Sequence, residues 1–224
     1  MGSARLDGGD SSAGAGAKGR PGYSREEVVE VAIEEFLERG YEATSMGGLA
    51  TRLGISKSAI YHHVDSKEQL LQEAVDAALN ALAGVVAEVG QLDAGVECRL
   101  RRLVDGAVAV LAAKQAEVAL LLRLRGNSEV EKRALDRRRD ITNAVVELVV
   151  QGQEEGVVRR DILPGVAARL IFGVVNSMVD WYRPGGGAAY EEVREMVQKF
   201  IWTGLGLDVD AGESASDGPF CSFV

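Results

Sequence analysis

Apolar residues recur at intervals of three or four positions through most of this chain, which is the period of helices that bury one face. The first stripe, formed by Val28, Ala32 and Phe36, predicts a helix over 25–39. Similar stretches predict helices over 46–53, 57–63, 67–89, 94–113, 116–125, 128–154, 164–182 and 188–204. The strict alternation typical of strands does not occur, so the predicted fold class is all-α.

Serine and glycine residues mark the expected helix ends. Ser24 with Glu27, and Ser66 with Gln69, have the spacing of capping boxes, and Ser56 is the expected N-cap of the helix that follows it. The expected breaks between helices are Gly40, Gly54, Gly126, Gly156, Pro164 and the run at 184–187.

Two short helices joined at Gly54 follow a longer helix, which is the pattern of a helix-turn-helix. Short helices bury little surface alone, so Ile55, Ile60 and Val64 are expected to pack on the first helix. The opposite face then presents groups that can bond phosphates or base edges, namely Lys57, Ser58, Tyr61 and His62. His62 and His63 are adjacent and face apart on a helix, so no metal pair is expected.

Residues 24–71 closely resemble the DNA-binding domain of TetR-family repressors, through GYEATSM at 40–46, LGISK at 53–57, IYHHV at 60–64 and SKEQLL at 66–71. The resemblance implies that the third helix enters the major groove. It also implies that Thr44, Tyr61 and Lys67 hold phosphates, while residues 57–59 and His62 face bases. The predicted DNA-binding residues are Thr44, Ser45, Ser56, Lys57, Ser58, Ala59, Tyr61, His62 and Lys67.

Structural roles are the alternative for two of these residues. Tyr61 could brace two helices, and Lys67 could be a solvated cation in a first turn, where it opposes the helix dipole. The net charge of −9 excludes a bulk basic footprint, so DNA binding has to depend on a few placed donors. A helical interaction module without DNA binding is therefore a second class of function to test.

The rest of the chain resembles the TetR family in layout. The resemblance implies that the last two helices pair with their symmetry mates in a homodimer, which predicts a palindromic operator with half-sites about one DNA turn (~34 Å) or slightly more apart. The sequence DWYRPGG at 180–186 is similar to that of TetR-type regulators that respond to acyl-CoA thioesters. A drug or antibiotic is the alternative effector.

Basic residues gather at 123–140, where seven Lys and Arg face four Asp and Glu, a net of +3. The apolar stripe of the helix over 128–154 is interrupted at Arg137 or Arg138, so a guanidinium is expected to point inward. This guanidinium could bind an anionic effector. The alternatives are an internal ion pair with Asp136, Asp140 or another acidic neighbour, or a solvated helix face. The predicted ligand-binding residues are Arg123, Arg137, Arg138, Phe172, Asn176, Met178 and Trp181. Packing in a dimer core is the alternative for Phe172, Met178 and Trp181.

These observations predict four segments. Residues 1–22 form a disordered arm, 23–66 a helix-turn-helix domain, 67–206 a helical ligand-binding and dimerisation domain, and 207–224 a disordered acidic tail. The predicted function is that of a repressor that binds double-stranded operator DNA as a homodimer and is released by a small effector.

The sequence contains no Ser/His/Asp or Cys/His constellation, phosphate loop or metal-ligand cluster, so no enzyme activity, cofactor or metal is expected. No apolar run approaches the ~20 residues of a membrane span, and no membrane partner is expected. The expected location is the bacterial cytoplasm, at the nucleoid. Cys98 and Cys221 are expected to be free thiols there.

Overall fold

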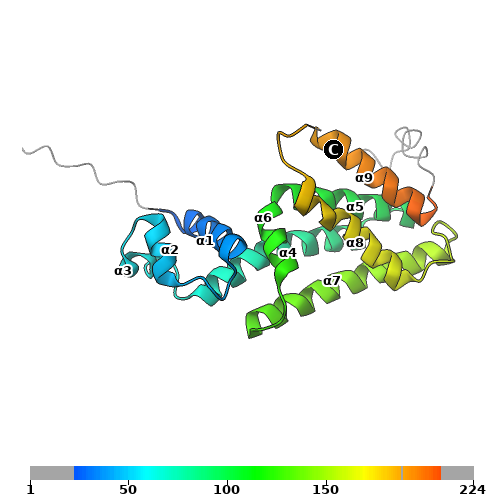
Figure 1. The fold of residues 1–224 in the computed structure, drawn as a ribbon. Coiled ribbons are helices and arrows are strands. Elements are labelled where there is room, and N and C mark those ends of the chain that lie inside the picture. Colours follow the sequence, from blue (N-terminus) through cyan, green and yellow to red (C-terminus); the bar gives the residue numbers. More distant parts are fainter. Residues whose placement is uncertain (1–22, 188, 208–224) are drawn as a thin grey trace, which may run out of the picture.

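The computed structural model describes residues 23–187 and 189–207. Within these ranges the chain forms nine helices and no strand, which confirms the predicted all-α class (Figure 1). The helices are α1 (Arg25–Arg39), α2 (Met46–Leu53), α3 (Lys57–Ile60), α4 (Lys67–Gln91), α5 (Val96–Ala113), α6 (Gln115–Arg123), α7 (Glu129–Glu154), α8 (Pro164–Trp181) and α9 (Tyr190–Leu205). The predicted arm and all of the predicted tail except Leu207 lie outside the described residues.

The small domain consists of α1, α2, α3 and the first turns of α4, and it occupies one end of the molecule (Figure 1). The expected caps are present. The Ser24 and Glu27 side chains each accept the other residue's backbone N–H, at 3.2 and 2.6 Å, and Ser66 accepts the N–H of Gln69 at 3.2 Å. These bonds satisfy N–H groups that the first helical turn leaves without a partner, and so fix where α1 and α4 begin.

The third helix is shorter than predicted. The expected range was 57–63, but α3 ends at Ile60. Beyond it, the N–H groups of His62 and His63 donate to the carbonyls of Ala59 and Ile60, at 3.1 and 3.0 Å. These bonds span three residues, so the chain continues as tighter turns rather than as an α-helix.

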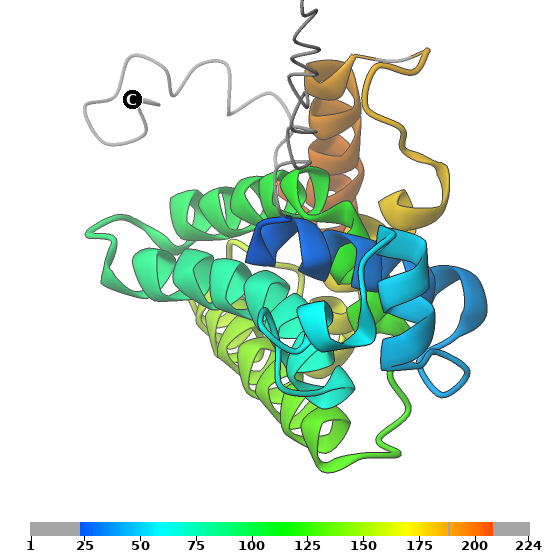
Figure 2. The same cartoon turned by 90° about the vertical axis from the view of Figure 1, so that its left-hand side faces the viewer.

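The larger domain is organised around α4, which runs out of the small domain and packs against α5, α6 and α7 (Figures 1 and 2). α8 lies on α5 and α7, and α9 covers α5 and α8. By length and composition α4 is apolar enough to cross a membrane, contrary to the sequence expectation. About a third of its apolar stretch is buried in the fold, including Leu71, Val75 and Leu79.

The α6–α7 turn is held by one buried carboxylate. Glu131 Oε2 accepts the backbone N–H groups of Arg125, Gly126 and Asn127, at 2.9, 2.8 and 3.2 Å, and the residue is only 4% exposed. Ser128 caps α7 through the N–H of Glu131 at 3.2 Å. The turn therefore fixes the direction in which α7 leaves α6.

Glu131→Ala should destabilise the fold, because it removes the common acceptor of these three N–H groups in a site closed to water. We expect the free energy of unfolding to fall by about 2–4 kcal/mol, measured by urea denaturation. Glu129→Ala is the control, because Glu129 is exposed and forms a surface pair with Lys132. Equal stability of the two variants would show that the buried carboxylate does not hold the turn.

The predicted free thiol at Cys98 is wrong. Cys98, on α5, is disulfide-bonded in the structure. Cys221 lies outside the described residues. The prediction used the expected redox environment, which does not report the bonds that a particular thiol forms in the fold.

Candidate DNA-binding surface and ligand cavity

The turn between α2 and α3 is built from local bonds. Gly54 has a φ of 68°, a left-handed conformation that glycine adopts without strain. The N–H of Ile55 then donates to the carbonyl of Ala50, and Ser56 caps α3 by accepting the N–H of Ala59 at 3.1 Å. Ile60 and Val64 are buried in the small domain and anchor α3 from the inside.

The opposite side of α3 and the turn after it faces solvent. Lys57, Ser58, Tyr61 and His62 are exposed there, and Tyr61 retains 45% of its accessible surface although it is aromatic. His63 is half-buried, so the two adjacent histidines face apart, as predicted. We call Lys57, Ser58, Tyr61 and His62 the recognition surface. It combines a cation, a hydroxyl, a phenol and an imidazole on one outward face.

The other predicted DNA-binding residues have local structural roles or are less exposed. Ser45 and Ser56 accept backbone N–H groups as N-caps of α2 and α3, and Ala59 is half-buried. Thr44 is buried, and its hydroxyl donates to the carbonyl of Gly40 at 3.0 Å. The structure therefore does not bring Thr44 to the recognition surface.

Lys67 contacts Tyr41, a partner that the sequence analysis did not identify. Its Nζ donates to the carbonyl of Tyr41 at 2.9 Å and lies 4.2 Å from the centre of the Tyr41 ring. The ring also packs edge-on against Phe36, with centroids 5.2 Å apart. Burial, followed by the nearby Glu68 carboxylate, raises the pKa of the Tyr41 hydroxyl above its ordinary value.

An ion cluster joins α1 to α2. Arg52 of α2 is bonded to the carboxylates of Glu34, Glu35 and Glu38 of α1, at 3.0, 2.6 and 2.6 Å. The hydrogen bond from Arg52 lowers the pKa of the Glu38 carboxyl group. Arg52 thus offsets one of the acidic charges of α1 and holds three of its carboxylates at the α1–α2 contact.

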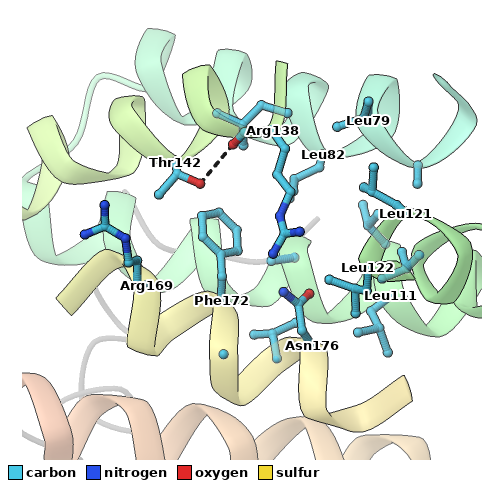
Figure 3. Close-up of a pocket in the computed structure, with 17 residues that line it drawn as sticks. Leu79, Leu82, Leu111, Leu121, Leu122, Arg138, Thr142, Arg169, Phe172 and Asn176 are labelled. Carbon is cyan, nitrogen blue, oxygen red and sulfur yellow. Dashed lines mark hydrogen bonds between the residues drawn. The ribbon is translucent and has the colours of Figure 1, made fainter. Parts of the chain in front are cut away.

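A cavity of about 280 Å³ lies in the larger domain between α4, α5, α6, α7 and α8 (Figure 3). The parts contributed by α4, α5 and α6 are apolar and include Leu79, Leu111 and Leu121. The polar lining residues come from α7 and α8 and are Arg138, Thr142, Arg169 and Asn176. The cavity is therefore amphipathic, with its polar groups on one side.

Three of the seven predicted ligand-binding residues line this cavity, namely Arg138, Phe172 and Asn176. Met178 is instead buried in the core of its own domain, and Trp181 is exposed at the end of α8. The sequence analysis missed Arg169 and Thr142. Neither carries a distinguishing signal, because both belong to ordinary helical patterns.

The remaining two arginines bridge structural elements outside the cavity. Arg137 forms an ion pair with Asp76 and donates to Asn80 Oδ1 at 2.6 Å, which ties α7 to α4. Arg123, at the end of α6, donates to the carbonyl of Leu37 in α1 at 2.5 Å. Arg137 therefore connects α7 to α4, which extends into the small domain, and Arg123 connects α6 to α1 of the small domain.

An apolar face remains exposed on α8 and α9. Its members are Val166, Leu170, Trp181, Met196 and Phe200. Met196 and Phe200 are each 68% exposed, one turn apart on α9. A set of large apolar side chains of this kind marks a surface that another molecule covers.

Comparison with known proteins places the chain in a family. The family model "Bacterial regulatory proteins, tetR family" matches residues 28–74, and the model "Tetracyclin repressor-like, C-terminal domain" matches residues 93–205. A solved TetR-family member from Streptomyces coelicolor A3 is 42% identical, with a TM-score of 0.75, over 82% of this chain and 93% of that one.

Two further relatives share both domains. The HTH-type transcriptional repressor KstR2 of Rhodococcus jostii is 28% identical over 192 residues, which are 81% of this chain and 90% of that protein. The solved ketosteroid transcriptional regulator KstR2 of Mycobacterium tuberculosis is 28% identical, with a TM-score of 0.73, over 81% of this chain and 94% of that one. The chain belongs to the TetR family of transcriptional regulators.

Proposed function

We propose that this TetR-family chain represses transcription by binding operator DNA through its recognition surface. The observation that carries the proposal is the orientation of α3: Ile60 and Val64 are buried, while Lys57, Tyr61 and His62 face outward. Donors of these types suit phosphates and base edges in a major groove. Relatives that are named transcriptional repressors support repression over activation. The protein acts in the bacterial cytoplasm, at the nucleoid.

The repressor works as a homodimer through the apolar face of α8 and α9. A two-fold axis at this face presents two recognition surfaces to the same side of a duplex, about one helical turn (~34 Å) or slightly more apart. The operator is therefore a palindrome. Phe200 and Met196 are the side chains that would gain most from burial against the second copy.

A small effector that occupies the cavity releases the operator. An acyl-CoA thioester, suggested by residues 180–186, would place its acyl group against the apolar lining, and a drug or antibiotic is the alternative. Leu79 and Leu82 of α4 line the cavity, and α4 begins in the small domain. A ligand that displaces α4 therefore changes the separation of the two recognition surfaces.

Arg137 transmits part of this displacement, because it joins α7 to α4 beside the cavity. We expect Arg137→Met to preserve operator binding but to reduce the ligand-induced loss of operator affinity, which corresponds to a coupling of about 1–3 kcal/mol in such systems. Arg139→Met is the matched control, because Arg139 pairs with Asp136 on the surface. Unchanged coupling in the Arg137 variant would remove Arg137 from the mechanism.

The proposed function is tested by sequencing the genomic fragments that the purified protein retains. We expect a palindromic motif shared by the fragments, and mobility shifts that confirm each of them. Retention of no fragment at low salt would favour the helical interaction module instead.

A further inference from the structure

The polar side of the cavity carries positive charge. The described lining residues include two arginines, Arg138 and Arg169, and no carboxylate. Arg169 lies toward the end of the cavity near Thr142, whereas the guanidinium of Arg138 reaches into the cavity and points toward the amide of Asn176 (Figure 3). A ligand between α7 and α8 would therefore meet a guanidinium and an amide together.

Arg138 differs from its two neighbours in having no protein partner. Arg137 pairs with Asp76, and Arg139 pairs with Asp136. In the described part of the chain, the Arg138 side chain forms no hydrogen bond or ion pair, and neither does the Asn176 amide. The internal ion pair of Arg138 with Asp136 or Asp140 is thus not formed. Five N–H donors of Arg138 and the amide of Asn176 remain for a ligand.

The partly buried guanidinium of Arg138 favours an anionic ligand. A guanidinium that is partly removed from water is unfavourable unless a negative charge compensates it. Its planar fork matches the two oxygens of a carboxylate, and the Asn176 NH₂ group can donate a further bond. A neutral thioester carbonyl accepts such bonds but does not compensate the charge.

The size of the cavity limits the ligand further. A volume of about 280 Å³ is slightly below the range of roughly 300–1,000 Å³ for drug-sized ligands. This space suits a medium-chain or arylalkanoic acid and does not enclose a nucleotide-bearing molecule.

We propose that the effector is a small amphiphilic monocarboxylate, in place of the acyl-CoA thioester that residues 180–186 suggest. Its carboxylate is bound by Arg138 and Asn176, and its apolar tail lies against Leu79, Leu111 and Leu121. The proposal rests on the proposed function, because it takes the cavity to be the effector site.

The test uses isothermal titration calorimetry on the full chain with matched probes. Octanoate, decanoate and 4-phenylbutyrate are each compared with the corresponding alcohol, and octanoyl-CoA is added as a thioester. We expect at least one carboxylate to bind about tenfold or more tighter than its alcohol. Arg138→Met should lower the affinity for that carboxylate about 10- to 100-fold and leave the affinity for the alcohol unchanged. Arg139→Met, the same substitution one residue along α7, should change neither.

Asn176→Asp gives a second, nearly isosteric test. It places a carboxylate beside Arg138, which should compete with the ligand and weaken carboxylate binding at least tenfold without affecting the alcohol. The proposal is overturned if every alcohol binds as tightly as its acid, if octanoyl-CoA binds while no free acid does, or if folded Arg138→Met and Asn176→Asp variants retain full carboxylate affinity. Mobility shifts without any ligand separate the two claims. Failure of the unmodified, ligand-free chain to bind DNA would overturn the proposed function, whereas a chain that binds DNA but fails the carboxylate tests would overturn only the effector proposal.

Discussion

Replacing both Lys57 and Tyr61 with alanine should lower operator affinity about 100-fold, because the dimer loses two contacts from each recognition surface. Both side chains are exposed, so the fold should be unaffected. The dependence of affinity on salt should also become shallower. Lys57 is an exposed cation, whereas Lys67 is bonded to Tyr41, so Lys57 is the lysine that we expect to neutralise a phosphate. Each such lysine that is lost lowers the slope by about 0.9, or about 2 for the dimer. Mobility shifts over a range of salt concentrations measure both quantities.

Arg160→Ala is the control for this double variant. Arg160 is an exposed cation in the α7–α8 loop, at the opposite end of the molecule from α3 (Figure 1). Its loss should leave both the affinity and the salt slope unchanged. Equal weakening by the two variants would mean that DNA is attracted by general charge, and not by the recognition surface.

Disrupting the apolar face of α8 and α9 should also lower operator affinity, in this case by dissociating the dimer. Leu170→Asp combined with Phe200→Asp places two carboxylates in the proposed dimer interface, where burial would remove their hydration without supplying a partner. The protein should become monomeric by size-exclusion chromatography with light scattering. Operator affinity should fall about 100-fold or more, because two linked half-site contacts become independent.

Leu92→Asp is the matched control for the dimer variant. Leu92 is also an exposed leucine, but it lies in the turn after α4 and is not part of α8 or α9. This substitution should leave both the dimer and the operator affinity intact. A double variant that stays dimeric would show that another surface joins the protomers.

Local signals explain why much of the fold could be predicted. Capping at Ser24 and Ser66 and the left-handed turn at Gly54 depend on residues a few positions apart, so the sequence shows them directly. The orientation of α3 follows similarly from apolar spacing, with Ile60 and Val64 on the inner side.

Contacts between distant residues could not be predicted in the same way. Lys67 bonds Tyr41, which lies 26 positions earlier, and no spacing rule connects them. Helical periodicity also does not show whether Arg137 or Arg138 points into the cavity. In the structure Arg137 forms an ion pair with Asp76 of α4, and Arg138 lines the cavity. Periodicity likewise does not separate a helix's own core from a dimer face or a cavity wall, so the burial of Met178 could not be predicted from its spacing.

The most direct measurement is site-specific cross-linking of the protein to a retained duplex. A photoreactive group is attached at position 62, in the turn after α3, or at position 160, at the far end of the larger domain. If α3 lies in a groove, the group at position 62 should cross-link to DNA bases near the centre of each half-site, and the group at position 160 should not react. Equal labelling from both positions, or labelling from neither, would contradict DNA recognition by α3.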